Sequence, residues 1–410
     1  MYSMRPFSLL IKPASGDCNL NCSYCFYLGT HAGFYPEEKV HRMSLPVLEM
    51  LTRTYLATPQ ASHNIAWQGG EPTIMGLPFF EKAVELQKLY MRPGGTVVNT
   101  LQTNGTLLND AFAAFLAREK ILTGISLDGP KDVHDHYRHR ISGGGSYDDV
   151  MRGIRCMEKA KAEFNILTLV NDVNVRQPER IYKFLCEQGF LFHQYIPCVE
   201  PDGKGGVSSH SVSGEAWGDF LCAIFDLWLP GDTRRVSIRQ FDAVFNLLVT
   251  GERVQCTMCN DCAQYLVVEY NGDIYPCDFF VEKAFLLGNV MRGGWSEFLG
   301  SPVYRNFGAQ KLQTHPKCAE CPCNWLCVGD CLKHRFCNGG GTPRRLSHLC
   351  VGWQRFYEYA LPRFVKLAEE FVAEQRRLQA ATGTGPNDPC ACGSGRKRKK
   401  CCGSSSQGGG

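Results

Sequence analysis

A chain of 410 residues is long enough for one large domain together with a smaller one. Its 44% hydrophobic and 20% charged residues are ordinary for a globular protein with a buried core, which excludes wholesale disorder. The formal net charge of +4 resides in a basic segment after residue 385, so the neutral body has no electrostatic reason to bind nucleic acid.

Two features of the sequence bear on location. No apolar run approaches the roughly 20 residues of a membrane-spanning helix, and the first residues lack the long apolar stretch of a signal peptide. We therefore expect a cytoplasmic protein. Its 22 cysteines would be kept reduced there and would serve as metal or cluster ligands rather than as disulfides.

Between about residues 5 and 235, short β-rich runs alternate with longer helical patterns. The predicted strands are Ser8–Ile11, Asn64–Trp67, Thr96–Gln102, Gly124–Leu127, Phe164–Val170 and His193–Pro197. The predicted helices include Pro46–Ala57, Phe79–Tyr90 and Asp110–Glu119. Six β-then-α units predict an α/β fold with a parallel sheet, curled or closed, and with functional residues at the carboxyl ends of its strands.

From about residue 236 to Cys350 the sequence is rich in cysteine. Strands predicted over Gln264–Tyr270 and Asp273–Pro276 flank Asn271-Gly272, a pair typical of a two-residue hairpin. Cys262 precedes the first strand and Cys277 follows the second, so antiparallel pairing brings their sulfurs toward one end of the hairpin. A long helix over Gln354–Leu378 and a small-residue linker over 380–385 follow.

The first cysteine group, Cys18-x3-Cys22-x2-Cys25, offers three thiolates from one loop directly after the first strand. Three ligands are one short of closing a tetrahedral zinc site or a [4Fe-4S] cluster, so one metal position stays open for a reactive cofactor. The alternative is a zinc knuckle whose fourth ligand is His31 or His41.

The second group contains eight well-spaced cysteines, which divide into two full sets of four. They are Cys256, Cys262, Cys277, Cys318, Cys321, Cys327, Cys331 and Cys350. Fully ligated clusters would have a structural or electron-transferring role, and the alternative is a pair of zinc ribbons. Cys259, Cys323 and Cys337 lie among them without an assigned role.

The C-terminal segment 386–403 has the pattern Cys390-x-Cys392-x8-Cys401-Cys402. Four sulfurs within 13 residues can close a tetrahedral zinc site that folds an otherwise unfoldable segment. It resembles the SEC-C zinc module, and its five bases suit an acidic partner, nucleic acid or the ribosome. The alternative is a disordered basic tail.

The first cysteine loop and the motifs at later strand ends resemble the radical S-adenosylmethionine (radical SAM) enzymes. The matching segments are Cys18-Asn19-Leu20-Asn21-Cys22-Ser23-Tyr24-Cys25-Phe26-Tyr27, Gly69-Gly70-Glu71-Pro72 and Ser126-Leu127-Asp128-Gly129. The resemblance implies that the methionine end of adenosylmethionine chelates the open iron. It also implies that Tyr24, Gly70, Ser126, Arg138 and Val199 contact that cofactor.

More narrowly, residues 6 to 375 resemble the anaerobic sulfatase-maturating enzymes, which carry a SPASM extension. The resemblance implies three [4Fe-4S] clusters. The inner auxiliary cluster would take Cys256, Cys262, Cys277 and Cys331, and the outer one Cys318, Cys321, Cys327 and Cys350. It further implies a partial (β/α)6 barrel over residues 1–235 and a SPASM domain over 236–379.

The implied reaction oxidises a Cys or Ser of an unfolded or nascent sulfatase to formylglycine. A 5′-deoxyadenosyl radical takes a hydrogen atom from Cβ, Asp278 takes a proton from sulfur or oxygen, and the inner auxiliary cluster takes one electron. The alternative for Asp278 is a solvated aspartate after a hairpin. An electron donor such as flavodoxin or ferredoxin would reduce the first cluster.

Two other functions stay open. One is a different SPASM peptide maturase, which forms thioether or carbon–carbon crosslinks. The 17 residues before Cys18 leave no room for a leader-peptide-binding domain, which favours the sulfatase interpretation. The other is a non-catalytic zinc scaffold that assembles partners through its cysteine-rich modules.

Overall fold

The computed structural model describes residues 5–30, 35, 38–335, 345–381, 385–390 and 394–401. Its strands are β1 (Ser8–Lys12), β2 (Ser62–Trp67), β3 (Thr96–Thr103), β4 (Leu122–Ser126), β5 (Phe164–Val170), β6 (Phe192–Pro197), β7 (Ser237–Ile238), β8 (Tyr265–Glu269), β9 (Asp273–Tyr275) and β10 (Gly288–Asn289). Its first seven α-helices are α1 (Phe26–Thr30), α2 (Leu45–Leu56), α3 (Leu77–Tyr90), α4 (Asp110–Arg118), α5 (Lys131–His134), α6 (Tyr147–Ala160) and α7 (Pro178–Glu187). The others are α8 (Gly214–Trp228), α9 (Arg239–Thr250), α10 (Trp295–Gly300), α11 (Pro302–Ala309), α12 (Asn324–Cys327) and α13 (Cys350–Ala381).

All strands belong to one ten-stranded sheet in the order β10-β9-β8-β1-β2-β3-β4-β5-β6-β7. The strands from β1 to β7 are parallel neighbours in chain order, as the β/α alternation predicts. The sheet ends at β10 and β7 and is not closed. The expectation that left closure open is therefore settled in favour of an open, partial barrel.

The cysteine-rich half of the chain extends the same sheet. β8 pairs in parallel with β1, in a register that joins Ser8 to Tyr265 and Lys12 to Glu269. β9 and β10 then continue the sheet in antiparallel orientation. The predicted hairpin therefore exists and is hydrogen-bonded to the first strand of the barrel.

Helix ends and core packing follow from local sequence. Ser44 caps α2 by accepting a hydrogen bond from the amide of Val47, and Asn109 caps α4 in the same way. Buried residues of helices and strands, such as Leu48 and Ile65, belong to one large hydrophobic core. No helix in the described part of the chain is long and apolar enough to cross a membrane.

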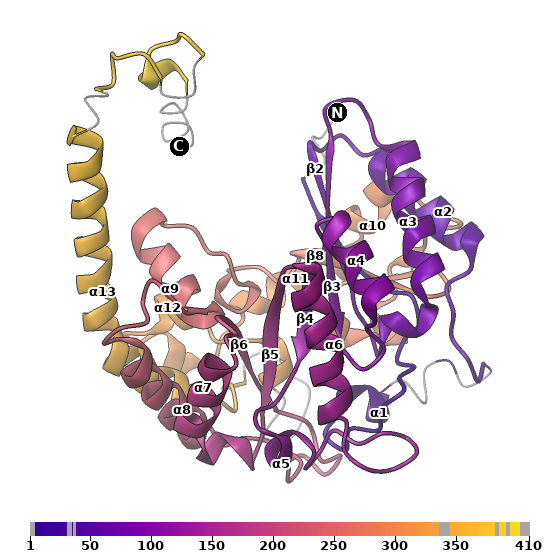
Figure 1. Ribbon diagram of the computed structural model, residues 1–410, viewed down its shortest axis with the longest axis horizontal. Coiled ribbons are helices and arrows are strands. Elements are labelled where there is room, and N and C mark those ends of the chain that lie inside the picture. The colour runs from indigo at the N-terminus through magenta and orange to yellow at the C-terminus, as the bar shows by residue number, and fades with distance from the viewer. Residues whose placement is uncertain are drawn as a thin grey trace.

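The long helix α13 packs along α8 and α9 near its start and then projects from the body, with the C-terminal segment at its far end (Figure 1). Gly352 of α13 lies so close to α8 that a Cβ on it would be 2.0 Å from the carbonyl oxygen of Gly214. Phe225 and Phe364 pack farther along, with ring centroids 4.9 Å apart.

The described part of the C-terminal segment forms a small turn. The amide of Cys390 donates to the carbonyl of Arg396 at 2.8 Å, and the amide of Arg398 donates to the carbonyl of Asp388 at 2.9 Å. Cys392 and Cys402 lie outside the described residues.

Candidate functional site

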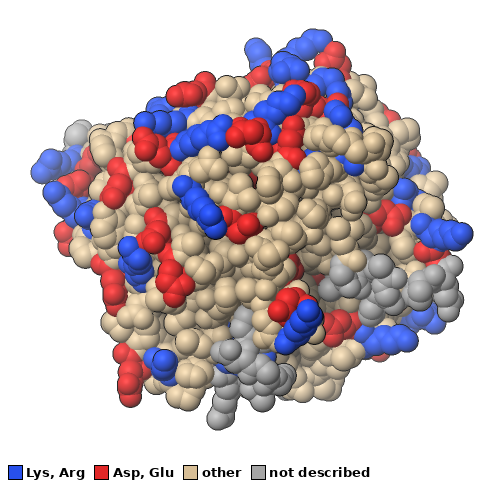
Figure 2. Space-filling view, turned by 90° about the horizontal axis from the view of Figure 1, so that it is seen from below, with Lys and Arg blue, Asp and Glu red and all other residues tan. Residues whose placement is uncertain are grey.

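The carboxyl ends of the parallel strands carry the predicted site residues. Helices α1 and α5, which follow β1 and β4, lie at the lower edge of the molecule in Figure 1. The view from below shows acidic and basic side chains interspersed around a broad area of other residues (Figure 2). This face therefore has no patch of a single charge sign.

Cys18, Cys22 and Cys25 stand in the loop that connects β1 to α1. The amide of Leu20 donates to the sulfur of Cys18 at 3.3 Å, and the side-chain amide of Asn104 donates to it at 3.6 Å. Burial, followed by the Glu71 carboxylate, raises the pKa of Cys18 to about 12. Burial likewise raises the pKa of Cys22 to about 11.

Three such thiols ionise only when a cation compensates them, which is what a bound iron–sulfur cluster provides. The two histidines considered as a fourth ligand give no support to a zinc knuckle. His31 lies outside the described residues, and Nδ1 of His41 contacts the Asp17 carboxylate at 2.7 Å.

Gly69 and Gly70 allow the end of β2 to lie directly against this cysteine loop. The amide of Gly70 donates to the carbonyl of Ser15 at 2.8 Å. A Cβ on Gly70 would lie 2.2 Å from the carbonyl oxygen of Asp17, so only glycine fits. The neighbouring Glu71 is fully buried and accepts hydrogen bonds from residues 73, 103 and 104.

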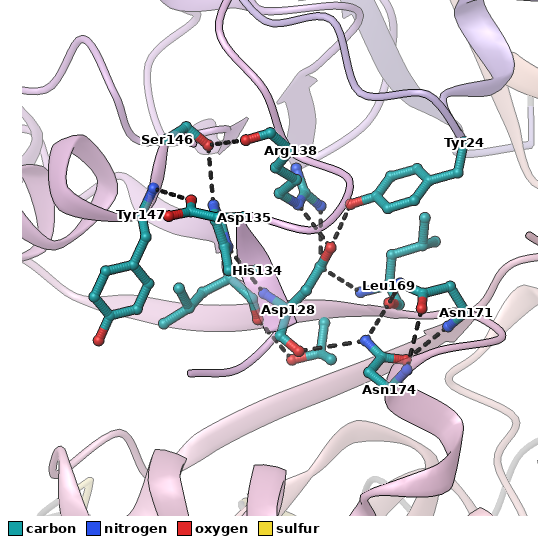
Figure 3. A network of polar contacts seen from close by, with 12 residues as sticks. Tyr24, Asp128, His134, Asp135, Arg138, Ser146, Tyr147, Leu169, Asn171 and Asn174 are labelled. Atoms are coloured by element: carbon teal, nitrogen blue, oxygen red, sulfur yellow. Dashed lines mark hydrogen bonds and ion pairs between the residues drawn. The ribbon is translucent and has the colours of Figure 1, made fainter. Parts of the chain in front are cut away.

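Asp128 connects two of the predicted adenosylmethionine contacts (Figure 3). Its carboxylate accepts a hydrogen bond from the hydroxyl of Tyr24 and pairs with Nε of Arg138 at 2.9 Å. It also accepts from the amide of Leu169 at 3.0 Å. The guanidinium of Arg138 is therefore already fixed by a buried carboxylate. Its exposed fraction is 11%.

The other two predicted contacts lie on neighbouring strands. Ser126 is the last residue of β4, and Val199 is fully buried shortly after β6. All five predicted contact residues thus lie at or beyond the carboxyl ends of β1, β2, β4 and β6, although the sequence places them up to 175 positions apart.

Asp278 is buried, so the alternative of a solvated aspartate is wrong. It follows β9, and only 4% of its surface is exposed. Its Oδ2 accepts from the hydroxyl of Tyr27 at 2.9 Å and from Nε2 of Gln68 at 3.2 Å. Its Oδ1 lies 3.3 Å from Nζ of Lys12, which also pairs with Glu269 at 2.7 Å.

These neighbours come from four different elements. Lys12 ends β1, Gln68 follows β2, Glu269 ends β8, and Tyr27 belongs to α1 just after the third cysteine. Lys12 and Glu269 are both fully buried. The pairing of β8 with β1 therefore brings a charged cluster around Asp278 to the edge of the sheet that carries the cysteine loop.

The eight cysteines of the second group lie in the two predicted sets. Burial contributes most to the raised pKa of each thiol, and other thiols contribute next to it or after nearby charges. Cys256 raises the pKa of Cys262, Cys277 and Cys331. Cys318 raises the pKa of Cys327 and Cys350, and Cys321 raises that of Cys318.

The cysteines without an assigned role are placed as follows. The thiol of Cys259 donates to the carbonyl of Gln255 at 3.5 Å. Cys323 is buried in the main core and has Cys321 as a close thiol neighbour. Cys337 lies outside the described residues. Within the described ranges, no three His, Cys, Asp or Glu side chains converge on one point as a single metal ion requires.

Sequence reasoning missed several polar residues of this site. Asp128, Tyr27, Gln68 and Lys12 all stand inside or beside the quoted motifs, where their position next to a strand end was the available signal. Glu269 is the exception, because it occupies an ordinary strand position whose importance depends on pairing with β1.

Comparisons with known proteins agree with this geometry. The model of the radical SAM superfamily matches residues 13–185, and that of an iron–sulfur cluster-binding domain, SPASM, matches residues 256–322. A serine-type anaerobic sulfatase-maturating enzyme of Bacteroides thetaiotaomicron is 36% identical over 388 residues, which are 90% of this chain and 93% of that protein. A cysteine-type anaerobic sulfatase-maturating enzyme of Clostridium perfringens is 36% identical over 370 residues, covering 89% and 99% respectively.

A solved structure of native anSMEcpe with bound AdoMet matches with a TM-score of 0.83 and 35% identity, over 89% of this chain and all of that chain. Because the likeness in sequence and in structure extends over nearly the whole barrel and the cysteine-rich half, it is not confined to a single motif. The chain belongs to the anaerobic sulfatase-maturating enzymes, within the radical SAM superfamily.

Proposed function

We propose that this chain oxidises a Cys or Ser side chain of an unfolded or nascent sulfatase to formylglycine. The observation that carries the proposal is the burial of Asp278 in a polar cluster at the end of β9, at the same edge of the sheet as the first cysteine loop. The reaction needs a proton acceptor close to a radical source, and family membership supplies the expectation of that source.

The residues present fit the cofactors that the family requires. Cys18, Cys22 and Cys25 would hold the first [4Fe-4S] cluster, and Tyr24, Gly70, Ser126, Arg138 and Val199 would contact adenosylmethionine. The inner auxiliary [4Fe-4S] cluster would be held by Cys256, Cys262, Cys277 and Cys331, and the outer one by Cys318, Cys321, Cys327 and Cys350. Buried thiols with raised pKa values support this assignment, because they require a cationic core to ionise.

When bound, the first cluster and adenosylmethionine supply the oxidising radical that removes a hydrogen atom from the substrate Cβ. The role of Asp278 is to accept the proton from the substrate sulfur or oxygen. Tyr27 and Gln68 hold its Oδ2 by hydrogen bonds. Among the described residues, Oδ1 has no hydrogen-bond donor and only the ion-pair contact with Lys12, so it is the oxygen with room for the substrate proton.

We also infer the division of the chain. Residues 1–235 form the radical SAM core, 236–379 the SPASM domain, 380–385 a linker and 386–403 a SEC-C type module. That module would bind one Zn²⁺ through Cys390, Cys392, Cys401 and Cys402, and its bases would contact the ribosome or another acidic partner. The spacing of the four sulfurs supports this. Flavodoxin or ferredoxin would supply electrons in the cytoplasm.

The test is anaerobic incubation of the reduced, iron-loaded enzyme with adenosylmethionine and a peptide of the Cys-x-Pro-x-Arg type. Its Ser counterpart serves as a second substrate and its Ala counterpart as a control. Formation of an aldehyde, detected by mass and by reaction with a hydrazide, supports the proposal. Loss of two hydrogens without aldehyde reactivity would assign the chain to the crosslinking maturases. A colourless protein with zinc instead of about twelve irons per chain would assign it to the scaffolds.

A further inference from the structure

Two fully or nearly fully buried cations lie in the cysteine-rich half of the molecule without a carboxylate partner. Lys311, between α11 and α12, has no exposed side-chain surface, and its Nζ donates only to the carbonyls of Thr257 at 2.9 Å and Asp330 at 2.6 Å. Arg335, whose exposed fraction is 3%, donates to four carbonyls, those of Val328, Gly329, Asp330 and Lys311, at 2.7 to 3.1 Å.

Neither cation has an acidic side chain within ion-pair distance in the part of the chain that the structure describes. The carboxylate of Asp330 is nearby, but it is bound by His334 at 2.8 Å and by the hydroxyl of Ser347 at 2.6 Å. The segment 336–344, which directly follows Arg335, contains no acidic residue. Two buried positive charges with only carbonyl dipoles as partners are unfavourable unless another anion compensates them.

Both cations face the cysteines. After the larger effect of burial, each of them lowers the pKa of thiols from both sets of four, which places it between the two sets. These thiols are Cys256, Cys262 and Cys327 for Lys311, and Cys262 and Cys318 for Arg335.

A strained loop fixes Arg335 in this place. Val328, Gly329 and Asp330 all have left-handed backbones, with φ angles of 47°, 69° and 62°. Such a conformation is unfavourable for a β-branched residue such as Val328 and needs a compensating interaction. The loop turns the three carbonyls toward the guanidinium, and it directly connects Cys327 of one set to Cys331 of the other.

We propose that Lys311 and Arg335 are shared counter-charges of the two auxiliary clusters, and that they raise the reduction potentials of both. The inference rests on the proposed clusters. A cluster held by four thiolates is anionic, and taking up one electron increases its negative charge by one unit. A buried cation nearby therefore favours the reduced form, because the protein interior screens the interaction less than water does.

The assigned role is to make each auxiliary cluster a better acceptor for the single electron that leaves the substrate. That electron passes from the substrate to the inner cluster and then to the outer one, while the proton goes separately to Asp278. Lys311 and Arg335 touch no reacting atom and act only through the clusters, so they are positioning residues.

The test is the midpoint potential of each auxiliary cluster in the full-length, iron-loaded enzyme, from a redox titration followed by electron paramagnetic resonance. A variant with Cys18, Cys22 and Cys25 replaced by Ala gives the auxiliary signals alone. Lys311→Met removes one charge at similar length, and Arg335→Gln removes the other. Arg335→Lys keeps the charge but cannot make the same four contacts.

Lys366→Met is the matched control for the lysine. Lys366 is exposed on α13, sixteen residues or about 24 Å along the helix from Cys350. We expect Lys311→Met and Arg335→Gln each to lower the equilibrium constant for reduction of at least one cluster by about tenfold or more, which is a fall of about 59 mV for one electron. We expect Arg335→Lys and Lys366→Met to stay near the parent value.

Unshifted potentials in fully iron-loaded Lys311→Met and Arg335→Gln would overturn the inference. So would an Arg335→Lys variant shifted as far as Arg335→Gln, because geometry rather than charge would then be responsible. If Lys311→Met fails to load its iron, the Arg335 pair decides. A parent protein without the iron of the auxiliary clusters would instead refute the proposed cofactors, so the two failures are distinguishable.

Discussion

Replacing Asp278 by Asn is the sharpest test of the proposed chemistry, because the structure separates its effect on folding from its effect on reaction. Asn keeps the shape, but its amide can satisfy only one of the two donors, Tyr27 and Gln68, that now bind Oδ2. Lys12 keeps its 2.7 Å contact with Glu269 and is not left alone. We therefore expect a loss of stability of about 1–3 kcal/mol, with clusters retained.

The effect on product formation should be larger. Loss of a general base lowers a rate by a factor on the order of 10² to 10⁴, which is about 3–5 kcal/mol in the barrier. The assay compares formylglycine formation by the parent and Asp278→Asn, using peptide deuterated at Cβ. Because hydrogen abstraction needs no carboxylate, deuterium should still reach 5′-deoxyadenosine in the variant.

Asp273→Asn is the matched control, since Asp273 begins β9 of the same hairpin and is not in contact with the buried cluster around Asp278. It should form formylglycine at nearly the parent rate. If Asp278→Asn forms formylglycine as fast as the parent with its clusters intact, the assignment of the base is wrong. If it also loses deuterium transfer, Asp278 serves to position the substrate.

Three further predictions concern the first cluster, the tail and a buried histidine. Cys22→Ala should abolish adenosylmethionine cleavage and leave roughly two thirds of the iron, and undiminished 5′-deoxyadenosine in a chromatographic assay would refute it. Truncation after Thr384 should leave peptide oxidation intact and remove about one zinc per chain by elemental analysis, whereas loss of turnover would show that the tail serves the active site. Burial lowers the pKa of His193 to about 4, so the unfolded chain takes up this proton first and the parent loses stability as pH falls below 6.5. The destabilisation by His193→Gln, measured by urea unfolding, should therefore shrink by about 2 kcal/mol between pH 7 and pH 5, and a constant difference would contradict this.

The strands of the barrel were predictable because each is a short apolar run bounded by turn residues. The run at Phe164–Val170, for example, coincides with β5. The hairpin was equally accessible from Asn271-Gly272. By contrast, β7 is only the two residues Ser237–Ile238, too short to produce a periodic signal.

The site was predictable where a residue belongs to a motif and not where it depends on distant pairing. Asp278 was identified through resemblance, and its position next to Cys277 is visible in the sequence. The contacts of Lys12 with Glu269 and Asp278 depend instead on the register between β1 and β8, which no local pattern encodes. The same holds for Lys311, whose surface-type side chain gives no sign of burial.

The pairing of β1 with β8 also sets the order in which the molecule can be completed. β1 is among the first residues to leave the ribosome, yet its partner is synthesised more than 250 residues later. Contacts this far apart in the chain form slowly and late. The first cysteine loop and Asp278 can therefore come together only after the hairpin has emerged. A nascent chain of this enzyme should consequently be unable to start radical chemistry before its electron-accepting half exists.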